Sequence, residues 1–202
     1  MIAILDYGSG NLRSAQRAFE TTGVDVVVTS DRKLALEAAG LVVPGVGAFQ
    51  SCMGGLVAIG GDDIIRERHS KQRPTLGICI GMQIFFSEGL EPSLKNPAST
   101  PGVGIWPGSI SKLNAPVLPH MGWNTVIAPA YSVLFDGVEG ESFYFVHSYA
   151  AKTAVGQKVS WSEYGEPFVS AVEDGATSAT QFHPEKSGSA GLRLIKNWTS
   201  SL

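Results

Sequence analysis

The chain has 202 residues, 44% of them hydrophobic and 16% charged, which is enough apolar sequence to bury one proper core and argues against disorder. The formal net charge of −3 gives no reason to expect nucleic acid or an anionic membrane as a partner. Two cysteines, Cys52 and Cys79, do not make a disulfide framework; they could pair, but a reducing compartment such as the cytoplasm is the simpler expectation.

The first residues, 1–5, form an apolar run that is too short for the core of a signal peptide and lacks a basic flank. No stretch of the sequence approaches the length of a membrane span. We therefore expect no membrane association, and a single domain over residues 1–202.

The first half of the chain alternates short apolar runs with helical spacing. Alternation of this kind predicts right-handed crossovers and a parallel sheet with helices on both faces. The loops after residues 5, 29, 43 and 78 should then converge beyond the carboxyl ends of the strands. We expect strands at 2–5, 24–29, 41–43 and 75–78, and helices at 12–22, 31–39, 62–72 and 80–87, with a weaker helix inside 45–61.

The second half has a different character. Prolines and glycines punctuate residues 91–149, which predicts short, mostly antiparallel strands on one side of the sheet. The cationic stretch that includes Arg66, Arg68, Lys71 and Arg73 has helical spread, so we expect a solvated helix face. The expected later strands are 104–106, 109–111, 142–146, 159–161, 169–173 and 178–182, before a closing helix at 191–198.

Cys79 lies between a predicted strand and a predicted helix, with Gly77 and Gly81 on either side. This pattern is typical of a nucleophile elbow, in which glycines let a strained turn fit between strand and helix. The sulfur would then lie at a helix N-terminus, where free N–H groups favour a thiolate. A buried, inert cysteine is an equally open interpretation of this stretch alone.

A cysteine nucleophile needs a base and a group that orients it. His183 ends an apolar strand, and because Pro184 favours an extended backbone at His183, the side chain of Glu185 should share its face. We expect His69 to face solvent from a charged helix, while the other two histidines, His120 and His147, have no carboxylate at triad spacing.

Two backbone N–H groups are candidates for an oxyanion hole. One belongs to Ile80, the residue after the cysteine, as elbow geometry requires. The other belongs to Val46, because the glycines at 45 and 47 would let its peptide reorient. A plain glycine-rich turn is the alternative for this loop.

Taken together, these segments resemble a known family. Residues 76–83 (LGICIGMQ), 44–49 (PGVGAF) and 181–187 (QFHPEKS) resemble the signatures of the class I, or triad, glutamine amidotransferases. Residues 6–12 (DYGSGNL), 119–124 (PHMGWN) and 144–149 (YFVHSY) further resemble the glutaminase subunits of imidazole glycerol phosphate synthases. The similarity runs in order from the first residues to the last helix, without a departure at any signature position.

The resemblance implies a three-layer, flavodoxin-like α/β fold with a central, mostly parallel sheet and an added small antiparallel sheet. It implies that Cys79 is the nucleophile, His183 the general base and acid, and Glu185 its orienting group. Gly47 and Gln83 would hold the glutamine substrate, and neither a cofactor nor a metal is expected. Glutamine would be hydrolysed to glutamate and ammonia through a cysteine thioester.

The resemblance also implies a partner, a (β/α)₈-barrel cyclase subunit bound as a heterodimer. The ammonia would pass to it for the synthesis of imidazole glycerol phosphate and aminoimidazole carboxamide ribonucleotide in histidine biosynthesis. The cyclase ligand would raise glutaminase activity by reorienting residues 44–47. Ordinary core or surface positions are the alternative for the aromatic and methionine residues concerned. The expected contact residues are Asn11, His120, Met121, Trp123, Asn124, Tyr144 and Lys186.

Three other functions use similar elements. A different glutaminase or a stand-alone γ-glutamyl hydrolase would turn over substrate at full rate without a partner. A catalytically silent interaction module should lack a triad member, and none is missing here. A redox or stress-response cysteine protein would not need the segment from His183 to Glu185.

Overall fold

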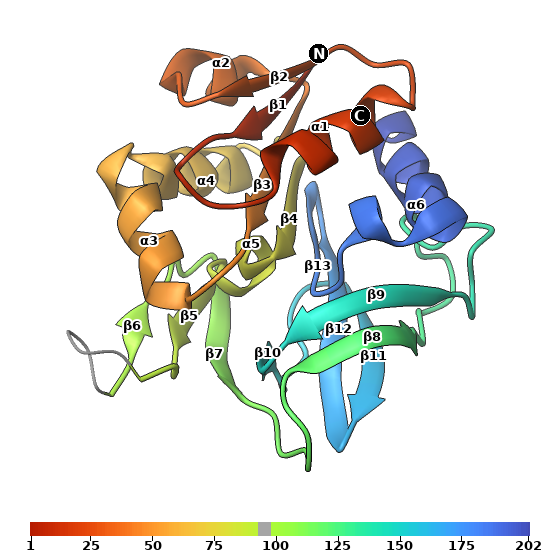
Figure 1. Cartoon of the computed structure of the whole chain (residues 1–202). Helices are drawn as coiled ribbons and strands as arrows, with labels where there is room; N and C mark the ends of the chain where they lie inside the picture. The colour runs from red at the N-terminus through yellow and green to blue at the C-terminus, as the bar shows by residue number, and fades with distance from the viewer. Residues whose placement is uncertain (93–97) are drawn as a thin grey trace.

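A seven-stranded sheet forms the centre of the computed structural model, which describes residues 1–92 and 98–202 (Figure 1). The strand order is β11-β12-β13-β4-β3-β1-β2. From β2 to β13 neighbouring strands are parallel, and β12 and β11 are added antiparallel at the far edge. The strands are β1 (Ile2–Leu5), β2 (Val26–Thr29), β3 (Gly40–Gly45), β4 (Thr75–Cys79), β11 (Lys158–Tyr164), β12 (Glu166–Asp174) and β13 (Thr177–Thr180).

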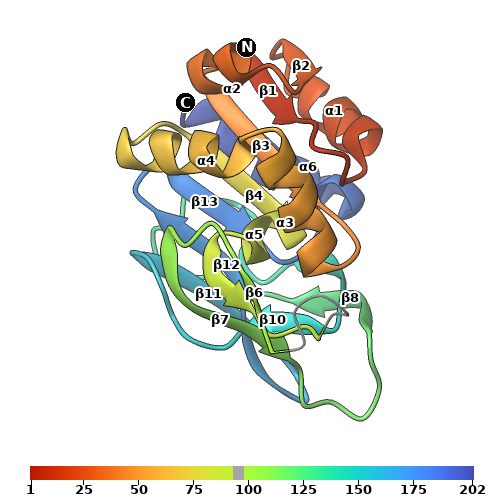
Figure 2. The ribbon, with the colours of Figure 1, turned by 90° about the vertical axis from the view of Figure 1, so that its left-hand side faces the viewer.

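Helices cover both faces of this sheet, as the alternating pattern predicts (Figure 2). On one face α1 (Leu12–Glu20) packs against α6 (Gly188–Ser200), with the rings of Phe19 and Trp198 5.8 Å apart. On the other face lie α2 (Arg32–Glu37), α3 (Phe49–Ala58) and α4 (Gly61–Ser70). Side-chain caps begin two of the helices, since Asn11 accepts from the Ser14 N–H and Asp31 from the Leu34 N–H.

Two smaller sheets lie beyond the carboxyl ends of β3 and β4 (Figure 1). One has the order β10-β7-β5-β6, and the other is the two-stranded ribbon β8–β9. The three-layer α/β architecture with an added small sheet is therefore confirmed, although β5 and β7 pair in parallel. Of the proline- and glycine-rich stretch 91–149, residues 93–97 lie outside the described residues. The strands are β5 (Phe86–Gly89), β6 (Thr100–Pro101), β7 (Trp106–Lys112), β8 (His120–Thr125), β9 (Ser142–His147) and β10 (Tyr149–Ala151).

The helix expected over residues 80–87 is wrong in its second half. The helix α5 (Ile80–Gln83) ends after four residues, and the chain continues into the strand β5. The rings of Phe85 and Phe86 both pack edge-on against Trp106, at 5.5 and 5.6 Å. Pairing of β5 with β7 buries these aromatic side chains, and this tertiary contact overrides the local helical pattern.

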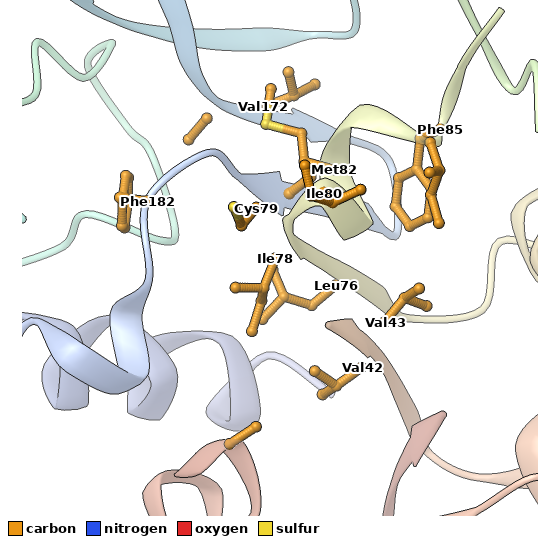
Figure 3. Packing of buried hydrophobic residues seen from close by; sticks show 14 of the residues in the cluster. Val42, Val43, Leu76, Ile78, Cys79, Ile80, Met82, Phe85, Val172 and Phe182 are labelled. Carbon is orange, nitrogen blue, oxygen red and sulfur yellow. The ribbon is translucent and has the colours of Figure 1, made fainter. Parts of the chain in front are cut away.

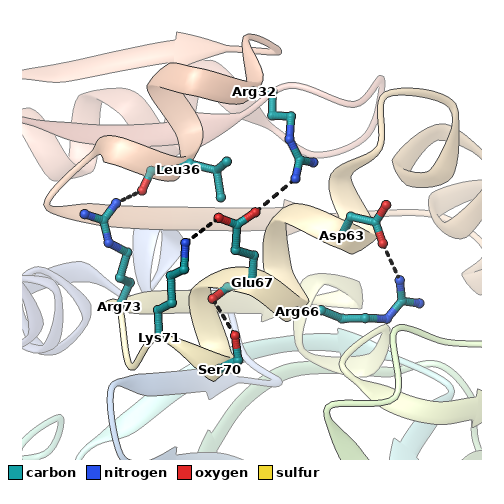
Figure 4. A network of polar contacts seen from close by, with 8 residues as sticks. All are labelled: Arg32, Leu36, Asp63, Arg66, Glu67, Ser70, Lys71 and Arg73. Carbon is teal, nitrogen blue, oxygen red and sulfur yellow. Dashed lines mark hydrogen bonds and ion pairs between the residues drawn. The ribbon is translucent and has the colours of Figure 1, made fainter.

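The solvated helix face expected around Arg68 is also wrong for that residue. Most of the face is exposed and carries ion pairs, with Glu67 between Arg32 and Lys71 and with Arg66 bonded to Asp63 (Figure 4). Arg68 instead is fully buried. Its guanidinium donates to the backbone carbonyls of Ala35, Leu36, Ala38 and Pro74 and to the Thr75 hydroxyl.

Arg68 therefore ties the end of α2 to the start of β4, the strand that leads to Cys79. Burial lowers the pKa of the Arg68 side chain to about 10, which still leaves it charged at neutral pH. The positive charge is favourable here because the carbonyls at a helix C-terminus carry partial negative charge. His69, expected to face solvent, is half-buried with Nδ1 2.9 Å from the Thr177 hydroxyl. Within the described ranges, the structure contains no helix long and apolar enough to cross a membrane.

Replacing the buried guanidinium should destabilise the fold. In Arg68→Met, several carbonyls lose their partner in a buried place, and the free energy of unfolding should fall by on the order of 3 kcal/mol. Arg66→Met is the matched control on the same helix, since Arg66 is exposed and should cost less than about 1 kcal/mol. Urea unfolding followed by circular dichroism measures both, and equal losses would show that Arg68 has no special role.

Candidate active site

Cys79 lies at a turn that few residues other than glycine adopt. Its backbone has φ 56° and ψ −112°, between the end of β4 and the start of α5. A β-carbon on Gly81 would lie 1.8 Å from the Val43 carbonyl oxygen, and one on Gly77 would lie 2.7 Å from the Gly81 carbonyl oxygen. Only glycine fits at either position, so the flanking pair is a requirement of the packing. The elbow predicted from the sequence has the expected geometry.

The thiol lies within an apolar setting but at the floor of an open pocket. Cys79 is 3% exposed, with Ile78, Ile80 and Phe182 around it (Figure 3). Ile80 is the first residue of α5, so its N–H has no partner within the helix and is placed at the helix N-terminus. This position suits an oxyanion donor.

His183 and Glu185 form the buried pair that the sequence predicts. His183 Nδ1 is 2.7 Å from Glu185 Oε1, and the two side chains are 2% and 4% exposed. The contact forms although Pro184–Lys186 is a short 3₁₀ turn, not an extended segment; only His183 itself has an extended backbone. The hydrogen bond fixes the ring and leaves Nε2 as the free nitrogen.

The charge state of His183 is set by its two neighbours. Burial acts to lower the pKa of His183, but Cys79 and Glu185 raise it by more, and the pKa lies at about 10. Nε2 has no hydrogen bond of standard geometry among the described residues, although Cys79 is near enough to act on this pKa. The arrangement favours a protonated imidazole facing the sulfur.

Two buried glutamines lie on the other side of Cys79. Gln83 Nε2 donates to Gln181 Oε1 at 2.9 Å and to the Tyr149 carbonyl at 2.8 Å. Gln181 Nε2 in turn lies 3.8 Å from Cys79 Sγ. Gln83 is a substrate residue that the family resemblance predicts, whereas Gln181 was given no role, although it opens the signature segment 181–187.

The Val46 peptide lies beside the pocket with its N–H turned to the opposite side. This N–H donates to Ser9 Oγ at 3.1 Å, and the Ser9 hydroxyl lies 2.9 Å from the Val46 carbonyl. Cys52 Sγ lies 3.3 Å from the same carbonyl, beneath the loop. Gly47 follows at φ 90°, which only glycine adopts readily. Of the two predicted oxyanion donors, Val46 is engaged by Ser9, whereas Ile80 is placed at the start of α5 beside Cys79.

A pocket of about 400 Å³ brings these groups together. Glu91 and Lys186 add opposite charges to its wall, and the Phe49 N–H holds the Glu91 carboxylate at 2.9 Å. No sequence motif marks Glu91, and the family resemblance assigns Lys186 only to the partner interface. Of the four loops expected to converge, those after residues 43 and 78 supply pocket residues, whereas those after residues 5 and 29 supply none. The loop after residue 5 instead contacts the Val46 peptide through Ser9. The pocket is lined by Val46, Gly47, Cys79, Ile80, Gln83, Glu91, Val146, His147, Ser148, Tyr149, His183 and Lys186.

The β8–β9 ribbon presents an exposed face next to the pocket mouth. Met121 pairs with Val146 and Trp123 with Tyr144, and the two β8 side chains are 62% and 60% exposed. Residues one position along each strand face inward. His120, expected at an interface, is therefore 3% exposed and offers no surface to a partner in this conformation.

Of the remaining expected contact residues, one is half-buried and two are exposed. Asn124 is half-buried on the inner side of β8, whereas Asn11 is exposed at the start of α1. Lys186 is exposed at the pocket. Over residues 1–92 and 98–202 no group of three or more histidine, cysteine, aspartate or glutamate side chains is placed to hold a metal ion.

Comparison with known proteins shows which family of sequences the chain matches. Residues 3–200 match the family model described as glutamine amidotransferase class-I. The chain is 56% identical to the imidazole glycerol phosphate synthase subunit HisH of Mycolicibacterium paratuberculosis, over the whole chain and 98% of that protein. It is 55% identical to the HisH subunit of Nocardia farcinica and 51% identical to that of Streptomyces coelicolor, again over the whole chain, and covers 98% and 93% of those proteins.

Solved structures share the fold at lower identity. A crystal structure of a glutamine amidotransferase superposes with a TM-score of 0.74 at 17% identity, with 98% of each chain covered. The PurLQS structure from Thermotoga maritima gives a TM-score of 0.72 at 16% identity, with 99% of this chain and 97% of that chain covered. These likenesses support the three-layer fold.

The charge of His183 gives a direct test of the site's electrostatics. Glu185→Gln removes one of the two groups that raise the pKa of His183, so this pKa should fall below its value in the unchanged protein. Titration of His183 by NMR measures it, with the exposed acid Glu139→Gln as control. An unchanged pKa in Glu185→Gln would contradict the role of the carboxylate.

Proposed function

The chain belongs to the class-I glutamine amidotransferases, and from this premise we propose that it is the glutaminase subunit of an imidazole glycerol phosphate synthase. Residues 1–202 act as one glutaminase domain. The observation that carries the proposal is that Cys79 and the buried His183–Glu185 pair line one pocket.

In the first half-reaction, Cys79 Sγ attacks the side-chain amide carbon of glutamine, and the carbon–nitrogen bond breaks. His183 gives its Nε2 proton to the departing nitrogen, which leaves as ammonia. The γ-glutamyl group remains on Cys79 as a thioester. Glu185 holds the imidazole in the required orientation through its 2.7 Å contact with Nδ1.

In the second half-reaction, neutral His183 accepts a proton from water, and the hydroxide attacks the thioester carbon. The carbon–sulfur bond breaks and returns Cys79 as a thiolate beside protonated His183. The new carboxylic acid loses its proton to solvent, and glutamate leaves.

The pocket charges suit an α-amino acid substrate. The carboxylate of Glu91 fits the α-ammonium group of glutamine, and the ammonium of Lys186 fits its α-carboxylate. Both Nε2 hydrogens of Gln83 are engaged by the protein, which leaves its Oε1 as the acceptor for substrate. Gly47 adds backbone to the pocket wall without side-chain bulk.

The oxyanion hole is half assembled in this conformation. Ile80 supplies one N–H, while the Val46 N–H is engaged by Ser9. One missing donor costs about 3 kcal/mol of transition-state stabilisation, or about a hundredfold in rate. We propose that the cyclase, with its nucleotide bound, favours the reoriented Val46 peptide and so completes the hole.

A partner over the pocket also serves the chemistry. Ammonia released into water would be protonated and lost as a nucleophile, so a sealed route to the second active site is needed. The exposed Met121–Trp123 face beside the pocket mouth is the proposed docking surface for a (β/α)₈-barrel cyclase in a heterodimer. There the ammonia would enter the synthesis of imidazole glycerol phosphate and aminoimidazole carboxamide ribonucleotide. Two free cysteines fit a cytoplasmic location for this reaction.

Cys79→Ala tests the assignment of function. In complex with a cyclase, this variant should lose glutamine-dependent formation of imidazole glycerol phosphate by several orders of magnitude, because no thioester can form. Added ammonium should still support synthesis, since the cyclase and its docking are untouched. Cys52→Ala is the matched control and should keep glutamine-dependent synthesis within about tenfold. Glutamine turnover in Cys79→Ala would show that another group is the nucleophile.

Ser9→Ala tests the engaged state of the Val46 peptide. Loss of the Ser9 hydroxyl removes both of its hydrogen bonds to Val46. The bond that holds the Val46 N–H is worth about 0.5–1.5 kcal/mol, so glutamine turnover without the cyclase should rise at least two- to tenfold. Release of glutamate by the isolated chain measures it. The exposed Ser70→Ala serves as control. A partner-free rate that is unchanged or lower in Ser9→Ala would contradict this role.

A further inference from the structure

Two buried histidines take no part in the chemistry described so far. His120 and His147 are 3% and 6% exposed, and Nδ1 of the first lies 3.0 Å from Nε2 of the second. Burial lowers the pKa of His120 to about 4 and is the main cause that lowers the pKa of His147 to about 3. Both rings are therefore neutral, so each has one donor and one acceptor nitrogen.

From His147 a series of hydrogen bonds leads to the nucleophile. His147 Nδ1 lies 3.0 Å from the Tyr149 carbonyl, which also accepts from Gln83 Nε2 at 2.8 Å. The second hydrogen on Gln83 Nε2 goes to Gln181 Oε1, and Gln181 Nε2 reaches Cys79 Sγ at 3.8 Å. The series therefore crosses from β9 through β10 and α5 to Gln181, directly after β13, and ends at Cys79 on β4.

In the other direction the series ends under the exposed face of the ribbon. Asn124 Nδ2 lies 3.3 Å from His120 Nε2 and donates to the Glu163 carbonyl at 2.9 Å. His120 and Asn124 lie on β8 on the inner side of the strand that carries Met121 and Trp123 outward. A movement of β8 would therefore shift the outward side chains of Met121 and Trp123 and the inward side chains of His120 and Asn124 together.

Because the Tyr149 carbonyl can only accept, it determines which atom donates and which accepts in every hydrogen bond of the series. A carbonyl only accepts, so His147 donates from Nδ1 and must accept at Nε2. His120 then donates from Nδ1 and accepts from Asn124 at Nε2. At the other end the carbonyl receives both donors, so Gln83 presents its nitrogen there and Gln181 is left to present its nitrogen to the sulfur. No imidazole or amide side chain of the series can rotate by 180° without breaking a buried hydrogen bond.

We propose that His120 and His147 are positioning residues, which hold Gln83 and Gln181 in the one orientation that places a donor on Cys79 and couple that orientation to the β8 strand. The inference rests on the proposed function only in its second part, the coupling to a partner docked on β8. The first part concerns this chain alone. The Gln181 N–H donor, 3.8 Å from the sulfur, holds Cys79 Sγ in place, so loss of the alignment should slow reactions of Cys79.

The test compares three variants by the rate at which iodoacetamide alkylates Cys79, resolved from Cys52 by mass spectrometry. His120→Leu removes both nitrogens and should slow alkylation about tenfold. His120→Asn keeps an amide nitrogen near the place of Nδ1 and should recover most of the rate. Phe168→Leu is the matched packing control, because the Phe168 ring packs on both histidines, at 5.6 and 4.9 Å, and lies outside the series.

Slow alkylation in His120→Leu with recovery in His120→Asn and a normal rate in Phe168→Leu would support the positioning role. Equal losses of alkylation rate in His120→Leu and Phe168→Leu would show that His120 acts only through packing and would overturn the positioning role. No loss of rate in either variant would overturn it as well. If His120→Leu does not fold, Asn124→Leu cuts the series at its outer end, and an unchanged alkylation rate there would overturn the proposal.

A second readout tests the coupling to a partner. In complex with a cyclase and its nucleotide, glutamine turnover by His120→Leu should be stimulated about tenfold less than turnover by Phe168→Leu. Equal stimulation of the two variants would overturn the coupling. Alkylation needs neither glutamine nor a partner, so the positioning role stands or falls separately from the proposed function. Failure of that function would show as absence of glutamine turnover in the unchanged protein.

Discussion

The close approach of α5 to β3 decides where every other part of the site lies. The Gly81 backbone passes so near the Val43 carbonyl that a β-carbon would stand 1.8 Å from it, and a β-carbon on Gly45 would stand 2.7 Å from the Gly81 nitrogen. With strand and helix this close, the chain must turn sharply at one residue, and Cys79 takes a positive φ to do so. The sulfur is thereby fixed at the carboxyl end of β4, where the neighbouring strands deliver their loops.

Two polar systems of opposite character then meet at this sulfur. The His183–Glu185 pair carries charge, and its neighbours raise the pKa of His183 to about 10. On the other side Gln83 and Gln181 are neutral, and burial keeps the histidines behind them uncharged. The His183–Glu185 pair suits proton transfer, whereas Gln83 and Gln181 hold the sulfur in position without competing for the proton. The nucleophile can thus be both reactive and precisely placed.

Much of this arrangement could be predicted from the sequence, and the exceptions share a physical cause. Alternating patterns predicted the parallel sheet, and the glycine–cysteine–glycine spacing predicted the elbow, because both follow from local chemistry. Arg68 and the strand β5 were predicted wrongly, since distant carbonyls and the Trp106 ring decide their environment. Gln181 and Glu91 were missed for the same reason. Their roles come from contacts across the fold, which spacing along the chain does not reveal.

We propose that this site is assembled but held at low activity until a partner completes its oxyanion hole. The most direct measurement is glutamate release by the chain alone, with a cyclase subunit, and with cyclase plus its nucleotide. A gated site predicts a low rate alone and a rate that rises with each addition, since the engaged Val46 peptide leaves one oxyanion donor missing. Equal rates under all three conditions would contradict activation by a partner and would indicate a self-sufficient glutaminase.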